Sequence, residues 1–509
     1  MLRRDDDSTG DQMAEFDLAI IGGGINGTGI ARDAAGRGLK VLLVEQNDLA
    51  SGTSSASTKL IHGGLRYLEH GALRLVREAL TEREILLRMA PHLIRPMRFV
   101  LPAQGGSRPA WMLRIGLFLY DHLGGRKLLP RTTTLDLTHH PVGAPLRRRY
   151  TGGFEYSDCV VDDSRLVVLN AVDAAERGAL IRTRTRCIRA ERTDEWRLAL
   201  VSHGRREART ARVLINAAGP WIGTVAETVI RTPERAPVRL AKGSHVVVKK
   251  LFAHDRGYVF QGPDGRVVFA LPYHRDFTLI GTTDLDFEGD LANLVPTADE
   301  ITYLCNTVDL YLREVVLPVD VVWAFAGVRS LHDDGSKKAG DVTRDYVIAL
   351  DHKFHTAPLL SIYGGKITTY RRLAEAALAR IDDFFVAGPA WTAGAPLPGG
   401  DFAHDGLDDQ VARATERWPF LGAEHARRLV GAYGTRIGHV LGDARALDDL
   451  GTRFGADLTA AEVRYLMRHE WAETADDVLW RRSKLGLAFT PGEREALAQF
   501  MSGEGARAA

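Results

Sequence analysis

Four cationic side chains stand in short turns where their spacing suits the binding of an anion. Arg329 and Arg344 lie in Gly-Val-Arg and Thr-Arg-Asp turns, Lys366 follows two glycines, and Arg66 with Tyr67 comes shortly after another glycine pair. Guanidinium groups present planar, paired donors that match a phosphate group. A solvated surface position is the alternative for any one of these residues, but their placement in turns favours a phosphate-binding site.

A histidine is the candidate proton acceptor. His245 has an ordinary pKa near 6.5, close to neutral pH, whereas arginine stays protonated. Lys366 is the alternative base if burial beside arginines lowers its pKa, and His245 then serves only as a phosphate ligand. His62, between an apolar pair and two glycines, has two open interpretations, a site residue or a residue that only shapes its turn. Neither a cluster with metal-ligand spacing nor a Gly-x-Ser-x-Gly elbow occurs, so the sequence predicts no metal site and no serine hydrolase.

The first part of the chain has the pattern of a nucleotide-binding unit. Residues 16–21 form an apolar run, residues 22–29 are glycine-rich and open a helical pattern, and residues 40–44 form a second apolar run that ends at Glu45. Glycines placed after a strand and before a helix are typical of a βαβ unit that binds a dinucleotide pyrophosphate at the helix N-terminus. A glycine-rich turn without a ligand is the weaker alternative.

Each residue of this unit has an expected task. Gly22 permits the tight turn, Gly24 lets the pyrophosphate approach the backbone, and Gly27 lets the helix pack against its strand. Glu45, 23 residues after Gly22, is expected to accept hydrogen bonds from a ribose diol. These residues alone do not distinguish NAD from FAD.

A polar run after Glu45 and two later glycine-containing turns complete the candidate cofactor groove. The hydroxyl groups and backbone amides of the run suit a phosphate or a flavin. The full set of candidate cofactor residues is Gly22, Gly24, Asn26, Gly27, Glu45, Thr53, Ser54, Ser55, Ser57, Lys59, Leu60, His62, Gly63, Gly64, Ala218, Gly219, Gly365, Lys366, Ile367 and Thr368.

Composition and charge exclude several classes of protein. The 66 basic and 65 acidic residues leave a formal charge of +1, which argues against general nucleic-acid binding. The three cysteines have no close partner in the sequence, which fits a reducing compartment better than a disulfide framework. The acidic N-terminal segment lacks the apolar core of a signal peptide, and no run of about eighteen apolar residues occurs, so we expect a cytosolic tail and no spanning helix.

Recognisable motifs are spread over nearly the whole chain. They occupy residues 22–29, 53–69, 217–221, 242–245, 327–329, 343–346, 364–371, 469–472 and 479–482. Together they resemble one family, the FAD-dependent glycerol-3-phosphate dehydrogenases of the aerobic, respiratory type. Thr58 stands where many relatives have serine, which keeps the hydroxyl group, and the acidic N-terminal tail has no counterpart in the family.

The resemblance implies an α/β fold with three parts. These are a doubly wound FAD-binding domain of the glutathione-reductase or D-amino-acid-oxidase type, an antiparallel-sheet substrate cap and an all-helical C-terminal domain. The expected limits are 1–14 for a disordered tail, 15–90, 150–235 and 340–387 for the discontinuous FAD-binding domain, 91–149 and 236–339 for the cap, 388–400 for a linker and 401–509 for the helical domain.

The resemblance also implies a reaction. The expected activity is oxidation of sn-glycerol 3-phosphate to dihydroxyacetone phosphate, with electrons passing from reduced FAD to a membrane quinone, in a homodimer. It places Arg66, Tyr67, His245 and Arg344 near the substrate phosphate, and Arg329 with Lys366 nearer the reacting carbon, so the expected catalytic residues are His245, Arg329 and Lys366. Two alternatives stay open: an oxidase that passes electrons to oxygen, and a non-catalytic flavin-binding redox sensor.

One segment suits the membrane interface. Residues 108–127 are apolar and aromatic, with basic residues at both ends. A buried core helix of the cap is the alternative from the sequence alone. The resemblance favours peripheral attachment, on the cytoplasmic face of the cell membrane.

Overall fold

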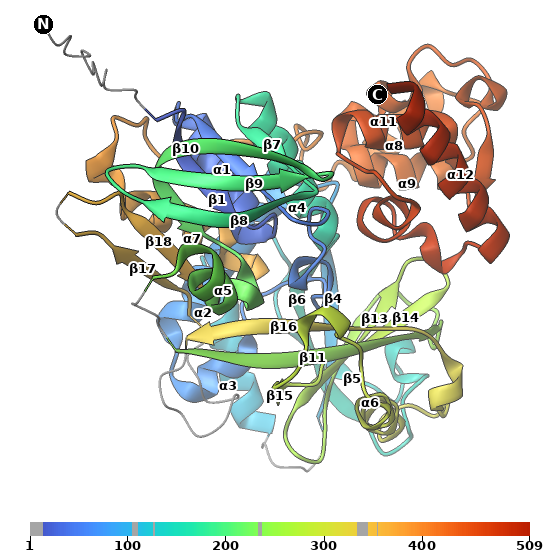
Figure 1. The fold of residues 1–509 in the computed structure, drawn as a ribbon. Coiled ribbons are helices and arrows are strands. Elements are labelled where there is room, and N and C mark those ends of the chain that lie inside the picture. The colour runs from blue at the N-terminus through green and yellow to red at the C-terminus, as the bar shows by residue number, and fades with distance from the viewer. Residues whose placement is uncertain are drawn as a thin grey trace, which may run out of the picture.

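Two large sheets and a helical C-terminal unit make up the structure (Figure 1). The structure is a computed structural model that describes residues 14–103, 110–125, 128–232, 237–332, 345–353 and 355–508. In the view of Figure 1 the first sheet with its helices lies above the second sheet, and the C-terminal helices lie beside both.

The first sheet is built around β1 (Phe16–Ile21), with β2 (Val41–Val44) and β10 (Arg205–Asn216) as its parallel neighbours. Its other strands and covering helices are β7 (Leu180–Arg182), β8 (Thr185–Arg192), β9 (Trp196–Ser202), β17 (Val347–Asp351), β18 (Leu359–Tyr363), α1 (Ile25–Gly36), α4 (Asp163–Glu176) and α7 (Tyr370–Ala379).

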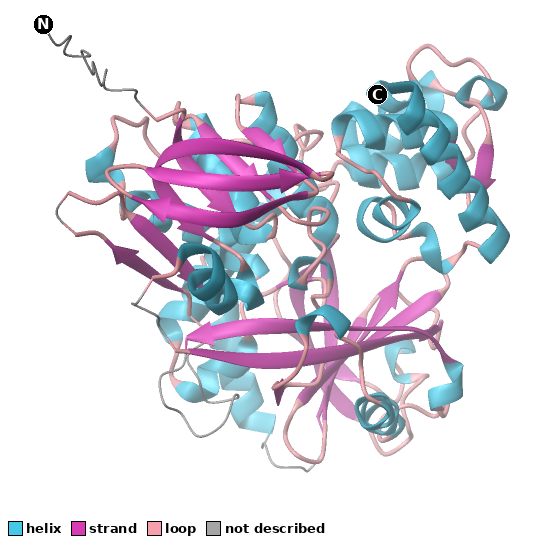
Figure 2. Cartoon of the chain, in the orientation of Figure 1, coloured by secondary structure: helices cyan, strands magenta, loops and turns pink. Residues whose placement is uncertain are grey.

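Both faces of the first sheet are covered, which explains its unbroken apolar strands. The three helices pack on one face and the β8–β9 hairpin shields the other (Figure 2). The strand order is β17–β18–β10–β1–β2–β7. From β1 the chain continues to β2 on one side, and the later strand β10 pairs with the other side of β1. A ligand crevice is therefore expected at the carboxyl end of β1, where the strand order reverses.

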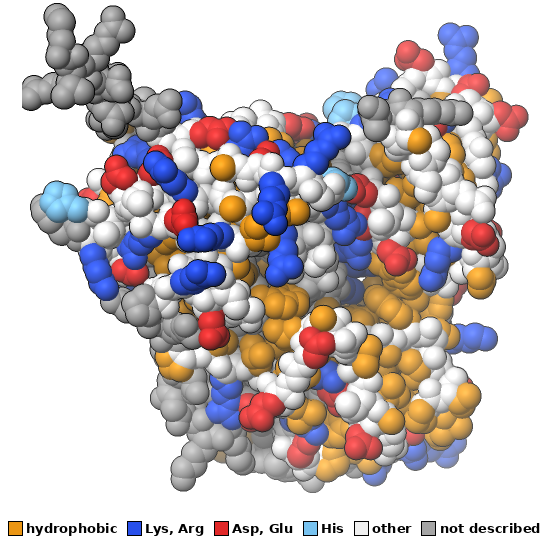
Figure 3. Space-filling view, in the orientation of Figure 1, with side chains coloured by type: hydrophobic (Ala, Val, Ile, Leu, Met, Phe, Trp, Pro, Cys, Tyr) orange, Lys and Arg blue, Asp and Glu red, His pale blue; other side chains and the backbone are white. Residues whose placement is uncertain are grey.

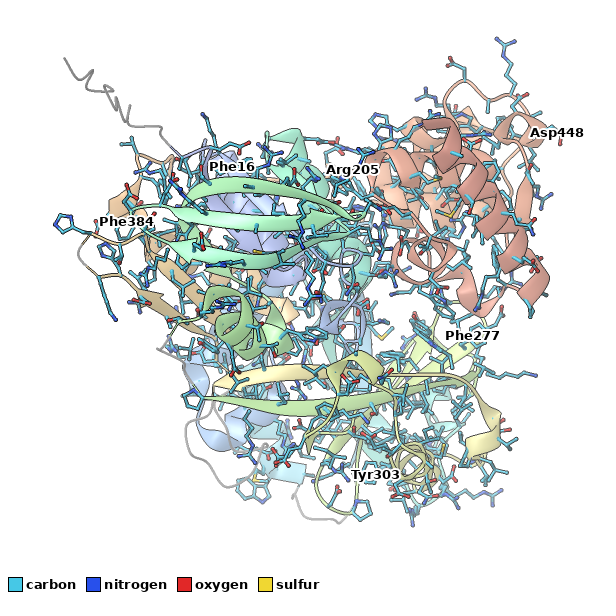
Figure 4. The ribbon with its side chains drawn as sticks, viewed as in Figure 1. Phe16, Arg205, Phe277, Tyr303, Phe384 and Asp448 are labelled. Carbon is cyan, nitrogen blue, oxygen red and sulfur yellow. The ribbon has the colours of Figure 1, made fainter. Side chains whose placement is uncertain are left out.

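The second sheet has ten strands and lies below the first in Figure 1. Its strands are β3 (Leu60–Ile61), β4 (Ile94–Ala103), β5 (Thr133–Asp136), β6 (Gly152–Val161), β11 (Val238–Lys249), β12 (Gly257–Gln261), β13 (Val267–Tyr273), β14 (Phe277–Gly281), β15 (Leu285–Asp286) and β16 (Val321–His332). The accompanying helices are α2 (Leu73–Met89), α3 (Ala110–Leu123) and α6 (Ala298–Asp309); Tyr303 marks α6 in Figure 4.

The second sheet differs from the expected cap in two respects. It is mixed rather than wholly antiparallel, because β12 pairs in parallel with β4. The expected limit at residue 150 also places β6 with the cofactor domain, whereas β6 pairs with β4 and β5 in the second sheet. The pairings of β4 with β12 and with β6 join segments far apart in the chain, so local patterns of alternation carry no signal for them.

The C-terminal unit is helical apart from a short ribbon. It contains α8 (Leu407–Arg417), α9 (Ala423–Tyr433), α10 (Ile437–Leu441), α11 (Ala460–His469), α12 (Pro491–Ala508) and the paired strands β19 (Arg453–Gly455) and β20 (Leu458–Thr459). These elements enclose a core of their own. Hydrophobic side chains also gather where this unit meets the second sheet (Figure 3).

The segment before this unit is packed, although its glycines and prolines suggest a linker. Leu397 is buried in the core of the first sheet's helices. Arg32 of α1 donates to the carbonyl oxygens of Ala395, at 3.1 Å, and Pro396, and its guanidinium group stacks on Trp391. Residues 388–400 therefore form part of the cofactor unit's own packing.

Candidate functional site

A cavity of about 1140 Å³ lies between the two sheets. It receives side chains from the start of α1, the turn after β2, strands β11 and β16, and the turn after β18. The candidate site residues on its wall are Thr53, Ser54, Ser57, Leu60, His62, Gly64, Arg66, Tyr67, His245, Arg329, Gly365, Lys366, Ile367 and Thr368. Arg344 lies outside the described residues.

The glycine turn after β1 has the close packing that its sequence predicts. Gly22 has a φ of +118°, and a Cβ atom there would lie 2.5 Å from the carbonyl oxygen of Ala217. A Cβ atom on Gly27 would lie 1.9 Å from the carbonyl oxygen of Gly22. Larger residues are therefore excluded at both positions, and α1 starts directly against the end of β1.

Polar groups around the start of α1 fit a dinucleotide. The carboxylate of Glu45 accepts from the backbone N–H groups of Gly23 at 2.7 Å and Asn47 at 2.8 Å, and burial raises its pKa. Asn26 donates to the carbonyl oxygen of Gly364, which joins the turn after β18 to α1. Its Oδ1 atom is buried and has no partner among the described residues. The unfilled Oδ1 acceptor fits an N–H donor of FAD, and the backbone N–H groups at the start of α1 fit its phosphate groups.

The hydroxyl-rich turn is held by a residue that the sequence reasoning missed. Asp163 is fully buried and accepts from Ser57 Oγ and from Lys59 Nζ, both at 2.8 Å. Lys59 also donates to the carbonyl oxygen of Ser55 at 2.9 Å. Lys59, expected among the cofactor contacts, thus fixes the turn from behind and does not line the cavity.

His245 lies on the cavity wall in a strongly desolvated position. Its Nε2 atom is 2.9 Å from Thr58 Oγ1, its ring stacks on Phe325, and its Nδ1 atom has no partner among the described residues. Burial, aided by the positive charges of Lys59 and Arg329, lowers its pKa to about 3. The sequence alone suggested the ordinary value near 6.5, because it carries no information on burial.

Three of the four predicted cationic side chains, Arg66, Arg329 and Lys366, line the same cavity. Lys366 Nζ lies 3.8 Å from the centre of the Tyr67 ring, which joins two motifs that are far apart in the chain. Arg329 donates to Asp284 at 3.0 Å, and Arg66 lies partly exposed on the same cavity wall. Asp284 is a second residue that sequence reasoning missed, since nothing in its local sequence marks it as the partner of Arg329.

The His62 turn is connected to α3 through buried polar groups. The backbone N–H of Gly63 donates to Tyr120 of α3 at 2.7 Å, and Tyr120 donates to Asp158 at 2.7 Å. Asp158 is paired with Arg83 at 2.6 Å. Burial and the charge of Lys366 lower the pKa of His62 to about 4, so its ring is neutral at neutral pH. His62 both lines the cavity and belongs to this packed turn.

The described residues offer neither a metal site nor a membrane-spanning helix. None of their groups of histidine, cysteine, aspartate and glutamate could hold a metal ion. Among them, no helix combines the length and the apolar character needed to cross a membrane.

Comparison with known proteins agrees with this geometry. The sequence signature described as FAD dependent oxidoreductase matches residues 17–371, and that of the C-terminal domain of alpha-glycerophosphate oxidase matches residues 390–502. The chain therefore belongs to the FAD-dependent oxidoreductases, and FAD is its cofactor.

Individual relatives indicate which family of FAD-dependent oxidoreductases the chain belongs to. A glycerol-3-phosphate dehydrogenase of Pseudomonas aeruginosa is 50% identical over 96% of this chain and 95% of the relative, and the aerobic enzyme of Escherichia coli is 46% identical over 96% and 98%. A D-erythritol 1-phosphate dehydrogenase of Brucella abortus is also 50% identical, over 95% and 97%. The solved structure of a Bacillus halodurans glycerol-3-phosphate dehydrogenase with FAD matches with a TM-score of 0.76 at 28% identity, over 97% of this chain and 91% of that one. The resemblance to the glycerol-3-phosphate dehydrogenase family is confirmed.

Proposed function

We propose that the protein oxidises sn-glycerol 3-phosphate to dihydroxyacetone phosphate by hydride transfer from C2 to FAD, and that the electrons then pass to a membrane quinone. The observation that carries the proposal is the convergence of Arg66, Arg329 and Lys366 with His245 on one cavity beside the dinucleotide-binding turn. Bound FAD supplies the hydride acceptor. The relatives named as glycerol-3-phosphate dehydrogenases support this substrate.

The cationic side chains bind and orient the substrate. Arg66 and Tyr67, with Arg344, hold the phosphate, while Arg329 and Lys366 lie nearer the reacting carbon. Paired guanidinium donors fix a dianion in one orientation, which places the C2 hydrogen for transfer. The Asp284 carboxylate fixes one end of Arg329 for this task.

His245 accepts the proton of the substrate hydroxyl group. Because its pKa is low, the ring is neutral and has a free lone pair at working pH. Proton acceptance at Nδ1 requires the tautomer in which Nε2–H donates to Thr58 Oγ1. The Thr58 hydroxyl oxygen accepts this hydrogen bond and holds the ring in place, which gives a role to the hydroxyl group at this position.

The quinone, which accepts the electrons, enters the cavity along α3. Met112, Ile115 and Leu119 of this helix line the same cavity and are exposed. Trp111 and Phe118 are 65% and 61% exposed on the same helix. An apolar face that continues into the cavity suits a lipid-soluble quinone and peripheral attachment to the cytoplasmic face of the membrane. The basic residues expected at the ends of this segment, Arg108, Arg126 and Lys127, lie outside the described residues.

Anaerobic mixing of the purified yellow protein with candidate alcohols tests the substrate. We expect rapid bleaching of the flavin absorbance by glycerol 3-phosphate and none by glycerol. Faster bleaching by D-erythritol 1-phosphate would assign the chain to the activity named for the Brucella relative instead. Absence of bleaching by either phosphate would contradict the proposal and favour a redox sensor.

The same preparation tests the acceptor and the assembly. With glycerol 3-phosphate in air and no detergent, we expect slow peroxide formation and fast reduction of an added soluble quinone. Fast peroxide formation would identify an oxidase. We also propose that the protein is a homodimer, and light scattering of the solubilised protein measures its mass in solution.

A further inference from the structure

We propose that the C-terminal unit sets the affinity for FAD by holding residues 45–59 from behind. This stretch, here called the cofactor segment, runs from Glu45 through the hydroxyl-rich turn to Lys59. Three cations of the C-terminal unit, Arg481, Arg482 and Lys484, reach two buried carboxylates that fix the two ends of the segment.

The first anchor is Asp48, which lies inside the cofactor segment and is fully buried. Its carboxylate accepts from Arg482 Nη1 at 2.9 Å and Nη2 at 2.8 Å, and from Arg481 Nε at 2.5 Å. Two residues later, the backbone N–H of Ala50 donates to the carbonyl oxygen of Gly23. The arginines of the C-terminal unit are therefore one short turn away from the phosphate-binding glycines.

The second anchor is Asp163, at the start of α4. It binds Ser57 and Lys59 of the cofactor segment through one carboxylate oxygen. Lys484 Nζ lies 3.6 Å from the other oxygen, and both lysines are almost fully buried. Lys59 has a φ of +60°, a backbone conformation that needs support for a residue with a side chain. The ion pair with Asp163 supplies that support.

The local backbone brings the three cations to these carboxylates. Residues Asp477–Arg482 form a π-helix, whose wider turn places Arg481 and Arg482 on the same aspartate. Lys484 has a φ of +59°, which turns its side chain toward Asp163. Two unusual backbone features thus occur within a few residues, both at contacts with the cofactor unit.

Not every ion pair between the two units has this role. Arg165 of α4 and Glu470 of the C-terminal unit form a buried pair with the same chemistry, with Nη2 to Oε1 at 3.0 Å. Neither residue contacts the cofactor segment among the described hydrogen bonds and ion pairs. Glu470 Oε2 also lies 3.7 Å from Arg482 Nε, and the Glu470 carbonyl oxygen accepts a hydrogen bond from Arg482 Nη2. A change of the Glu470 side chain to an amide leaves that carbonyl oxygen and both Arg482–Asp48 hydrogen bonds available, so the Arg165–Glu470 pair provides the control.

The test compares Asp48→Asn with Glu470→Gln in the full-length protein. Each substitution replaces a fully buried carboxylate of an interunit ion pair by its amide. FAD is removed from each protein, and its dissociation constant is measured by flavin fluorescence on rebinding, together with the thermal midpoint of the apoprotein. We expect Asp48→Asn to weaken FAD binding at least tenfold and Glu470→Gln to change it less than threefold.

If both variants bind FAD equally weakly, the effect is a general loss of stability and the proposal is wrong. Unchanged FAD affinity in Asp48→Asn would also overturn it. If Asp48→Asn does not fold, Arg481→Gln and Lys484→Met carry the test. In Arg481→Gln, Asp48 keeps its ion pair with Arg482. In Lys484→Met, Asp163 keeps its ion pair with Lys59. Each is expected to weaken FAD binding about threefold, and wild-type affinity in both would contradict the proposal.

Discussion

His245 shows how burial changes the chemistry of a residue. A histidine at its ordinary pKa is partly charged at neutral pH, but this one is neutral over the whole physiological range because its pKa falls to about 3. A neutral ring is ready to accept a proton but holds it weakly. For the proposed role of His245 as base, we therefore expect the proton to be accepted as the hydride departs rather than before.

Substitution of His245 tests this role. We expect His245→Ala to lower kcat about hundredfold, the usual contribution of a positioned base. Thr58→Val, which loses the hydroxyl group that contacts His245 Nε2, should lower kcat less, and Thr58→Ser should restore it. Steady-state kinetics with glycerol 3-phosphate provide the measurement. A rise in KM with unchanged kcat in His245→Ala would mean that His245 only binds the phosphate.

At the scale of elements, α3 has two faces with different tasks. Leu117 and Tyr120 are buried, and the Tyr120 hydroxyl supports the turn at Gly63. The opposite face presents large apolar side chains to solvent. The sequence interpretations of a core helix and of a membrane-contact helix therefore each describe one side of the same element, although membrane contact itself stays a prediction.

The exposed face of α3 gives a prediction on membrane binding. We expect the double variant Trp111→Glu, Phe118→Glu to bind phospholipid vesicles at least tenfold more weakly, since each large apolar side chain contributes about 1.5–3 kcal/mol when buried. Co-sedimentation with vesicles is the measurement. Val319→Glu, at an 83% exposed position on another surface element, is the control. Equal binding by parent and double variant would exclude α3 as the attachment site.

At the scale of the whole molecule, several buried histidines link stability to pH. Burial lowers the pKa of His62 to about 4 and those of His92 and His245 to about 3. In the unfolded chain each regains a pKa near 6.5, so unfolding takes up protons below that pH. Stability is therefore retained above about pH 6.5 and falls as the pH drops toward 4.

His92 permits a test that does not touch the cavity. At pH 5 each of these histidines lowers the free energy of unfolding by about 2 kcal/mol relative to pH 7. His92 packs against Phe402, so a phenylalanine suits its place. We expect His92→Phe to reduce the difference in unfolding free energy between pH 7 and pH 5 by about 2 kcal/mol. Urea unfolding of the apoprotein at pH 7 and pH 5 measures it. An unchanged difference between the two pH values would show that folding does not lower the pKa of His92.

Local motifs predict the cofactor unit well, because its determinants are close in sequence. Gly22, Gly27 and Glu45 belong to one βαβ unit, and their packing follows from the order of strand, turn and helix. The acidic partners were missed because their pairings span long stretches of chain: Asp163 lies 104 residues from Lys59, and Asp48 lies 434 residues from Arg482. A single sequence contains no signal for such pairings.

The buried course of residues 388–400 limits how the chain can be divided. Leu397 fills the helical core of the first sheet, and the guanidinium group of Arg32 depends on carbonyl oxygens from this stretch. A truncated protein that stops before this stretch would expose the apolar surface that Leu397 covers, and Arg32 Nη2 would lose both of its carbonyl acceptors, although Arg32 would keep its ion pair with Asp173. A minimal enzyme made of the first 387 residues is therefore not a realistic design. The stretch cannot be assigned to the cofactor unit alone either, because the Gly399 carbonyl oxygen accepts from the backbone N–H of Thr435 in the C-terminal unit.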